Sequence, residues 1–91
     1  MAIQICASGF GEDWDGTYVQ IDRDIYEKTP EQDYWIYHDS YYWYISDSPY
    51  QMRDDRRSVA RMIFAHLDID PKGNYTGIDS RPNGVVGEGP C

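Results

Sequence analysis

Hydrophobic and polar positions alternate along the first half of the chain, with the period of a β-strand. Residues 2–8 alternate moderately and suit a first strand. The turn pair Asp15-Gly16 then leads out of a glycine-rich acidic loop into residues 17–21, where apolar and polar side chains alternate again. We therefore predict two strands joined by a loop at the start of the sequence.

Two aromatic runs in the middle of the chain predict a β-hairpin. Residues 34–38 and 41–46 consist mainly of aromatic and β-branched side chains, and the polar pair Asp39-Ser40 separates them. Cross-strand pairs between such side chains contribute about 0.2–1 kcal/mol each. Because successive strand residues point to opposite faces, one aromatic set must be exposed or covered by another part of the molecule.

The second half of the chain is less clearly patterned. Residues 51–58 are charged and predict an exposed loop. The apolar side chains of residues 59–67 fit one face of a helix and also fit a buried strand, so both alternatives stay open. Beyond Pro71, the many glycines predict loop with one or two short strands. We expect one domain over residues 1–91: all-β, mainly antiparallel, a β-meander or half-barrel, with a short helix in 53–67 as the alternative.

The acidic charge of the chain disfavours several classes of partner. Its 91 residues include 16 acidic and 8 basic side chains, for a formal net charge of -8. Nucleic-acid binding needs basic side chains that displace phosphate counterions, so we expect neither a nucleic acid nor an anionic membrane as partner. No apolar run approaches the roughly 20 residues that span a bilayer, and the start lacks the basic leader of a signal peptide. We expect a protein made in the cytoplasm without a signal peptide.

The two cysteines, Cys6 and Cys91, lie near opposite ends of the sequence. A disulfide between them would close nearly the whole chain and contribute about 4–5 kcal/mol in the chain-entropy description. Two free thiols are the alternative, and the sequence leaves both open. A zinc site is disfavoured, because neither His38 nor His66 has metal-ligand spacing to a cysteine.

Four short motifs occur in order in the first half of the chain. They are Ser8-Gly9, Asp15-Gly16-Thr17-Tyr18, the tyrosine-rich run 34–37, and Trp43-Tyr44-Ile45-Ser46. Together they resemble a small, poorly characterised β domain that recurs, often in tandem, in microbial, protist and phage-like sequences. The resemblance implies a non-catalytic β-meander module with a further strand near residues 59–67, and it supplies no catalytic residues to transfer.

An acidic segment after residue 67 has part of the spacing of a calcium loop. Asp68, Asp70, Gly73 and Asp79 match four positions of the EF-hand loop. Lys72, however, stands where that loop needs an oxygen ligand. An acidic turn is the simpler interpretation, so we expect no cofactor, with calcium as the one alternative.

Side chains suited to catalysis do not form a recognisable pattern. A general base needs a nucleophile within reach and a partner that orients it. The sequence has no Gly-x-Ser-x-Gly elbow, and neither cysteine has a histidine nearby in sequence. We therefore expect a protein that is not an enzyme.

The aromatic content is the strongest indication of function. Nine tyrosines and three tryptophans exceed what the thin core of so short a chain readily buries. Exposed aromatics are typical of protein interfaces and of surfaces that stack on sugars. The candidate interface or ligand-stacking residues are Tyr34, Trp35, Tyr42, Trp43 and Arg57.

From these features we expect a structural or assembly module that binds copies of itself or a larger protein scaffold. An accessory (decoration or cement-like) protein of a virus or phage particle, or of a similar extracellular filament, would have this composition. One alternative is a carbohydrate-binding module that uses the same aromatic side chains. A second alternative is a calcium-binding domain built on Asp68, Asp70 and Asp79.

Overall fold

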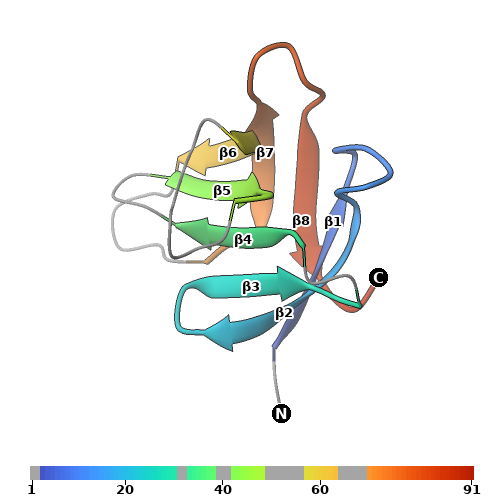
Figure 1. The fold of residues 1–91 in the computed structure, drawn as a ribbon, viewed down its shortest axis with the longest axis vertical. Coiled ribbons are helices and arrows are strands. Elements are labelled where there is room, and N and C mark those ends of the chain that lie inside the picture. The colour runs from blue at the N-terminus through green and yellow to red at the C-terminus, as the bar shows by residue number, and fades with distance from the viewer. Residues whose placement is uncertain (1–2, 31–32, 39–41, 49–56, 64–69) are drawn as a thin grey trace.

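The computed structural model describes residues 3–30, 33–38, 42–48, 57–63 and 70–91. In these ranges each strand pairs antiparallel with the next, and the last pairs with the first, so that the sheet closes into a barrel (Figure 1). No α-helix occurs within these ranges. The strands are β1 (Gln4–Ser8), β2 (Gly16–Asp22), β3 (Ile25–Lys28), β4 (Trp35–His38), β5 (Tyr42–Ser46), β6 (Ser58–Ile63), β7 (Gly73–Gly77) and β8 (Gly84–Glu88).

The expectation of an all-β, antiparallel domain is confirmed, and the sheet goes further than a half-barrel because β8 hydrogen-bonds to β1. The closing register pairs Cys6 with Gly87 and Ala7 with Val86. Closure removes the two exposed edges that an open sheet would present to other chains. The glycine-rich tail, expected to be mostly loop, thus supplies the two strands that complete the ring.

The aromatic hairpin forms as predicted, within a residue at each end. In the register of β4 and β5, Ile36 lies opposite Ile45 and Tyr37 lies opposite Tyr44. The proposed turn at Asp39-Ser40 lies outside the described residues.

The ambiguous segment after residue 58 is a strand as far as it is described. β6 pairs with β5, placing Ala60 opposite Ile45, and a β-bulge between Ile45 and Ser46 shifts the register. A helix over this part is therefore wrong: the backbone groups of β6 bond to β5 and to β7. Residues 53–56 and 64–67 lie outside the described residues.

Side chains fill the inside of the barrel. An eight-stranded barrel has an interior just wide enough for side chains, and inward residues alternate with outward ones. Trp43 and Tyr18 are essentially inaccessible, 1% and 0% exposed. The interior cluster consists of Ile5, Ala7, Phe10, Tyr18, Tyr26, Ile36, Trp43, Ile45, Val59, Ala60, Tyr75 and Val86.

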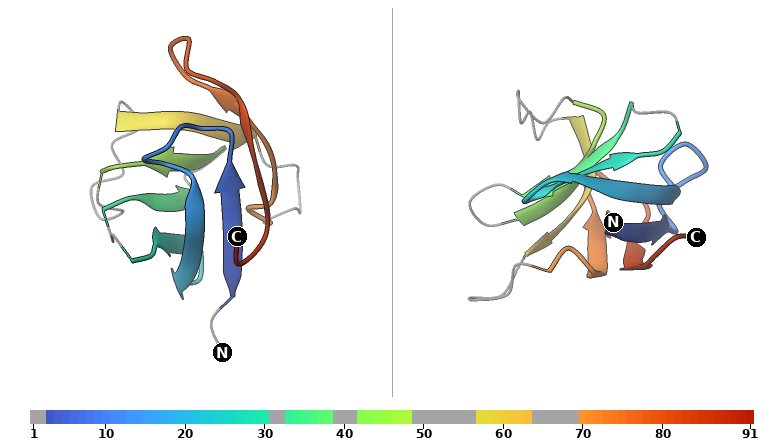
Figure 2. Two further views of the ribbon diagram at one scale, coloured as in Figure 1. Left: turned by 90° about the vertical axis from the view of Figure 1, so that its right-hand side faces the viewer. Right: turned by 90° about the horizontal axis from the view of Figure 1, so that it is seen from below.

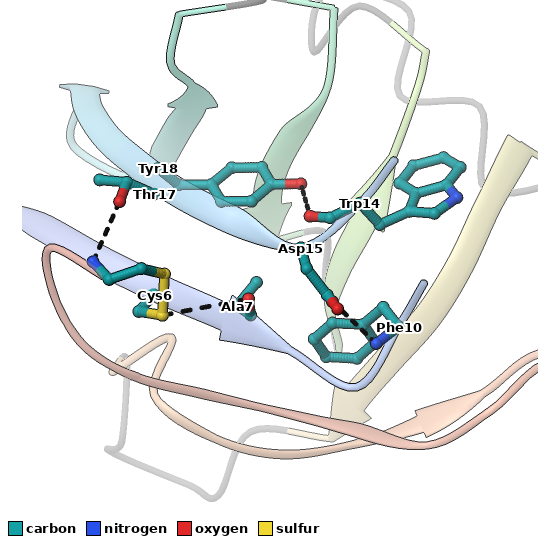
Figure 3. Close-up of a disulfide and its surroundings, with 8 residues drawn as sticks. Cys6, Ala7, Phe10, Trp14, Asp15, Thr17 and Tyr18 are labelled. Atoms are coloured by element: carbon teal, nitrogen blue, oxygen red, sulfur yellow. Dashed lines mark hydrogen bonds between the residues drawn. A yellow bond between two sulfur atoms is a disulfide. The ribbon is translucent and has the colours of Figure 1, made fainter. Parts of the chain in front are cut away.

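A disulfide joins Cys6 of β1 to Cys91 across 85 positions of sequence. Cys91, which lies beyond the end of β8, is thereby held beside β1 (Figure 2). The backbone nitrogen of Cys91 also donates to Thr17 Oγ1 at 3.0 Å, which ties the same segment to β2 (Figure 3). Of the two alternatives that the sequence left open, the structure contains the bonded one.

Candidate functional site

A second aromatic layer lies outside the filled barrel, on β4 and β5. Tyr37 and Tyr44 are directly paired, with ring centroids 6.2 Å apart, and Tyr42 lies 5.6 Å from Tyr44. We call the residues of this layer the outer aromatic surface: Trp35, Tyr37, Tyr42, Tyr44 and Arg61. Outward-facing barrel residues are usually polar, so this layer needs its own explanation.

The outer aromatic surface has a buried centre and a half-buried rim. Tyr37 and Tyr44 are 1% and 4% exposed and form a cluster of their own with Ile25. Trp35 and Tyr42 pack against that cluster and remain half-buried. Only the rim can therefore meet a partner.

Polar contacts hold the rim side chains in place. The indole Nε1 of Trp35 donates to Glu27 Oε2 at 3.1 Å, across the β3–β4 ladder. The guanidinium of Arg61 lies 4.7 Å from the centroid of the Tyr42 ring. A cation over a tyrosine face contributes about 0.5–1 kcal/mol at an exposed site. The side chains of Trp35 and Tyr42 are thus held in place without a partner.

Arg57, which the sequence analysis names as an interface residue, lies just before β6. Its Nε donates to Asp47 Oδ1 at 2.9 Å, and its side chain is 53% exposed. Arg61 was not among the interface residues predicted from the sequence. The alternation of strand residues could have placed it beside Tyr42, once β6 was recognised as a strand.

Two of the predicted interface residues lie away from the outer aromatic surface. Trp43 faces the interior, because the register that pairs it with His38 puts it on the same side as Ile36 and Ile45. Tyr34 precedes β4 and packs on Trp14, with ring centroids 4.7 Å apart. Of the five candidates, the structure brings Trp35 and Tyr42 together on one surface. Arg57 directly precedes β6 in the sequence.

Two of the three predicted calcium ligands, Asp70 and Asp79, lie on either side of one strand. Asp70 and Asp79 flank the two ends of β7, a five-residue strand about 16 Å long. Asp70 Oδ1 accepts from the backbone nitrogen of Lys72, and its other oxygen lies 3.5 Å from Lys72 Nζ. Asp68 lies outside the described residues. Among those described, no three His, Cys, Asp or Glu side chains form a metal-binding group.

Two interior tyrosines have perturbed ionisation. Burial raises the pKa of Tyr75 well above 10.0, and the negative charge of Asp70 adds to the shift. The Tyr75 hydroxyl donates to the Pro71 carbonyl at 2.6 Å. Burial, followed by Asp70 and Asp24, also raises the pKa of Tyr26. Both phenols are therefore neutral structural groups at ordinary pH.

Comparison of the chain with protein-family models, curated proteins and solved structures gives no match. The family resemblance of the first half thus stays a prediction. Within the described ranges there is no helix of the length and apolar character that crossing a membrane requires.

Proposed function

We propose that this protein is a non-enzymatic assembly module that binds copies of itself, or a larger protein scaffold, through the rim of the outer aromatic surface. The observation that carries the proposal is an aromatic layer outside a barrel whose interior is already filled. Tyr, Trp and Arg are the side chains that dominate the energy of protein interfaces. Trp35, Tyr42 and Arg61 supply one of each.

Charge supports a head-to-tail arrangement of copies. Arg61, on the outer aromatic surface, and Arg57, just before β6, are both exposed in a chain whose net charge is -8. The loop between β1 and β2 carries the exposed acids Glu12 and Asp13 and projects from the opposite side of the barrel to β5 and β6 (Figures 1 and 2). Contacts between unlike surfaces generate rings or open filaments rather than closed two-fold dimers.

An accessory protein of a virus or phage particle, or of a similar extracellular filament, is the setting that we propose for such an assembly. Disulfides persist on virion and cell surfaces and are rare in the cytosol. The Cys6–Cys91 bond suits a protein that works in that environment. The described strands close into a barrel, so copies would pack through side-chain surfaces rather than by adding strands to a sheet edge.

Sedimentation velocity of the oxidised protein over a wide concentration range tests the proposal. We expect reversible self-association that weakens as salt is added, because the arginines involved are exposed. Trp35→Ala or Tyr42→Ala should weaken association by about 2 kcal/mol or more, as for a hot-spot residue. The matched control is Ile21→Ala, which removes an exposed apolar side chain on β2, 45% exposed, outside the surface.

A protein that stays monomeric at the highest concentrations would overturn self-assembly and leave only binding to a different scaffold. Self-association that Ile21→Ala weakens as much as Trp35→Ala does would overturn the proposal. Circular dichroism of each variant must show the folded barrel, so that loss of association is not loss of structure.

A further inference from the structure

Two adjoining hollows lie on the outside of the barrel, on either side of β7. The first has a volume of about 460 Å³ and is lined by Ser8, Gly9, Asn74, Tyr75, Thr76, Asn83, Gly84 and Val85. The second has a volume of about 350 Å³ and is lined by Arg61, Met62, Asn74 and Thr76. Asn74 and Thr76 line both, so they form a ridge between the two hollows. Each volume falls within the range of small-molecule sites, roughly 300–1,000 Å³.

Backbone contact gives the first hollow its floor. A Cβ on Gly9 would lie 3.1 Å from Gly84 Cα, and a Cβ on Gly84 would lie 2.5 Å from the Ser8 carbonyl oxygen. Gly9 also has a φ of +90°, which favours glycine. The loop after β1 and the start of β8 therefore pack backbone to backbone, and no side chain at these two positions can fill the hollow.

The polar lining of the hollows is mostly neutral. Of the described residues that line them, Ser8, Asn74, Thr76 and Asn83 bring hydroxyl and amide side chains to the first, and Arg61 is the one charged side chain in the second. In a chain with 16 acidic residues, the absence of a carboxylate among these described lining residues is unusual. Such a lining offers many donors and acceptors to a neutral ligand and no strong attraction to an ion.

Both neighbours of β7 already pair with its backbone. β7 pairs with β8 from Gly73 to Tyr75 and with β6 at Thr76 and Gly77, and the nitrogen of Gly77 donates to Asn83 Oδ1 at 2.8 Å. An added peptide strand needs free backbone groups along an edge. The position of β7 inside the sheet thus favours recognition by side chains, and a ligand rich in hydroxyl groups over an extended peptide.

The composition of β7 is also unexpected for a strand. It reads Gly-Asn-Tyr-Thr-Gly, and both asparagine and glycine are depleted in strands. Asn74 is exposed in the middle of this strand. Strand stability does not account for an asparagine there, whereas a role in binding does.

We propose that the two hollows bind a short neutral oligosaccharide that crosses β7, with one sugar unit in each hollow. The side chains of Asn74 and Thr76 hydrogen-bond to hydroxyls of both units. The apolar side chain of Val85, 42% exposed, contacts the C–H face of the ring in the first hollow. This site is separate from the rim residues Trp35 and Tyr42, and the inference does not depend on self-assembly.

The test uses the oxidised full-length protein and a panel of short oligosaccharides of glucose, galactose and mannose. Sialylated and uronic-acid-containing oligosaccharides serve as the acidic counterparts. We expect binding to at least one neutral oligosaccharide, measured by calorimetric titration, and weaker binding to its acidic counterpart. Binding to no member of the panel, or a preference for the acidic members, overturns the proposal.

Two substitutions separate a binding role from a structural one. Asn74→Val removes a polar group and places a better strand former on β7, and Thr76→Val removes a hydroxyl while keeping a β-branched side chain. Each should weaken binding about tenfold, through the loss of hydrogen bonds to the ligand, while the unfolding midpoint stays equal or rises. The matched control is Gln4→Val, which removes an exposed amide on β1 that lines neither hollow.

The same titrations distinguish the hollows from the aromatic rim as the sugar site. If Trp35→Ala abolishes binding and Asn74→Val leaves it unchanged, the sugar stacks on the outer aromatic surface and the proposal is wrong. If Gln4→Val weakens binding as much as Asn74→Val does, the hollows are not the site.

Discussion

Tyr37 and Tyr44 lie opposite each other on β4 and β5, with ring centroids 6.2 Å apart, on the outside of the barrel. Both are almost fully buried, as is Trp43 on the inner side of the same sheet. The β4–β5 hairpin is therefore buried on both faces, which is unusual for an antiparallel pair in so small a domain. Its outer tyrosines have become part of the core.

Replacing Tyr44 should thus destabilise the fold like a core substitution. We expect Tyr44→Ala to lower the free energy of unfolding by about 3–5 kcal/mol, the cost typical of deleting a buried aromatic ring. Urea denaturation measures this directly. Tyr42→Ala is the comparison, since its ring is half-buried and should cost clearly less. Equal losses for the two variants would show that the outer layer is not part of the core.

Breaking the Cys6–Cys91 disulfide should cost a large share of the stability. The bond closes a loop with a sequence separation of 85, and the chain-entropy description gives about 4–5 kcal/mol for a loop of this size. Guanidinium denaturation with and without reductant measures the difference. The variant carrying both Cys6→Ala and Cys91→Ala should unfold like the reduced protein and should not respond to reductant. An unchanged midpoint in reductant would contradict the expectation.

The strands with clear aromatic or apolar alternation can be predicted from the sequence, and the strands without such a pattern cannot. The hairpin of β4 and β5 follows from its aromatic alternation, and β2 from the turn pair at its start. β6 is ambiguous because its apolar residues fit two periods, and only pairing with β5 decides between them. β7 and β8 contain four glycines and are strands because neighbours on both sides pair with them.

The candidate sites were less predictable than the fold. The sequence indicated that some aromatics would face outward, but the side to which Trp43 points depends on a register that the turn region sets. The hollows beside β7 had no signal in the sequence. The first of them depends on the backbone contact between Gly9 and Gly84, which are far apart along the chain.

Two glycines of β8 should respond in opposite ways to the same substitution. Gly84→Ala places a Cβ 2.5 Å from the Ser8 carbonyl oxygen and 2.6 Å from the Phe10 ring, so it should destabilise the barrel by about 1–3 kcal/mol. Gly87→Ala meets nothing within 4 Å and should be neutral or stabilise by up to about 1 kcal/mol. Thermal unfolding of the two variants gives the comparison. A loss of stability in Gly87→Ala that matches Gly84→Ala would refute the packing argument.

Stability should fall at alkaline pH because of Tyr75. Its pKa in the folded barrel lies well above 10.0, whereas in the unfolded chain it is near 10. Below that pH both states hold the neutral phenol, and its full contribution is present. Above it the unfolded chain loses the proton first, so the free energy of unfolding decreases as pH rises.

Denaturation curves from about pH 8 to about pH 11 measure this slope. Tyr75→Phe should lower stability near neutral pH, by removing the hydrogen bond to Pro71, and should flatten the alkaline slope. In the Tyr75→Phe variant a smaller alkaline slope should remain, because the pKa of Tyr26 is also raised. If Tyr75→Phe keeps the alkaline slope of the original protein, Tyr75 is not the source of that slope.

The pairing of β8 with β1 has a consequence for how the chain is made. During synthesis β1 emerges first, and one of its edges stays unpaired until β8 has left the ribosome. Contacts between such distant segments form slowly, and an unpaired edge can bind other nascent chains. The finished barrel has no edge to offer, so its most aggregation-prone form is the incomplete one. The yield of folded protein in cells should therefore depend more on how soon the last strand arrives than on how stable the completed ring is.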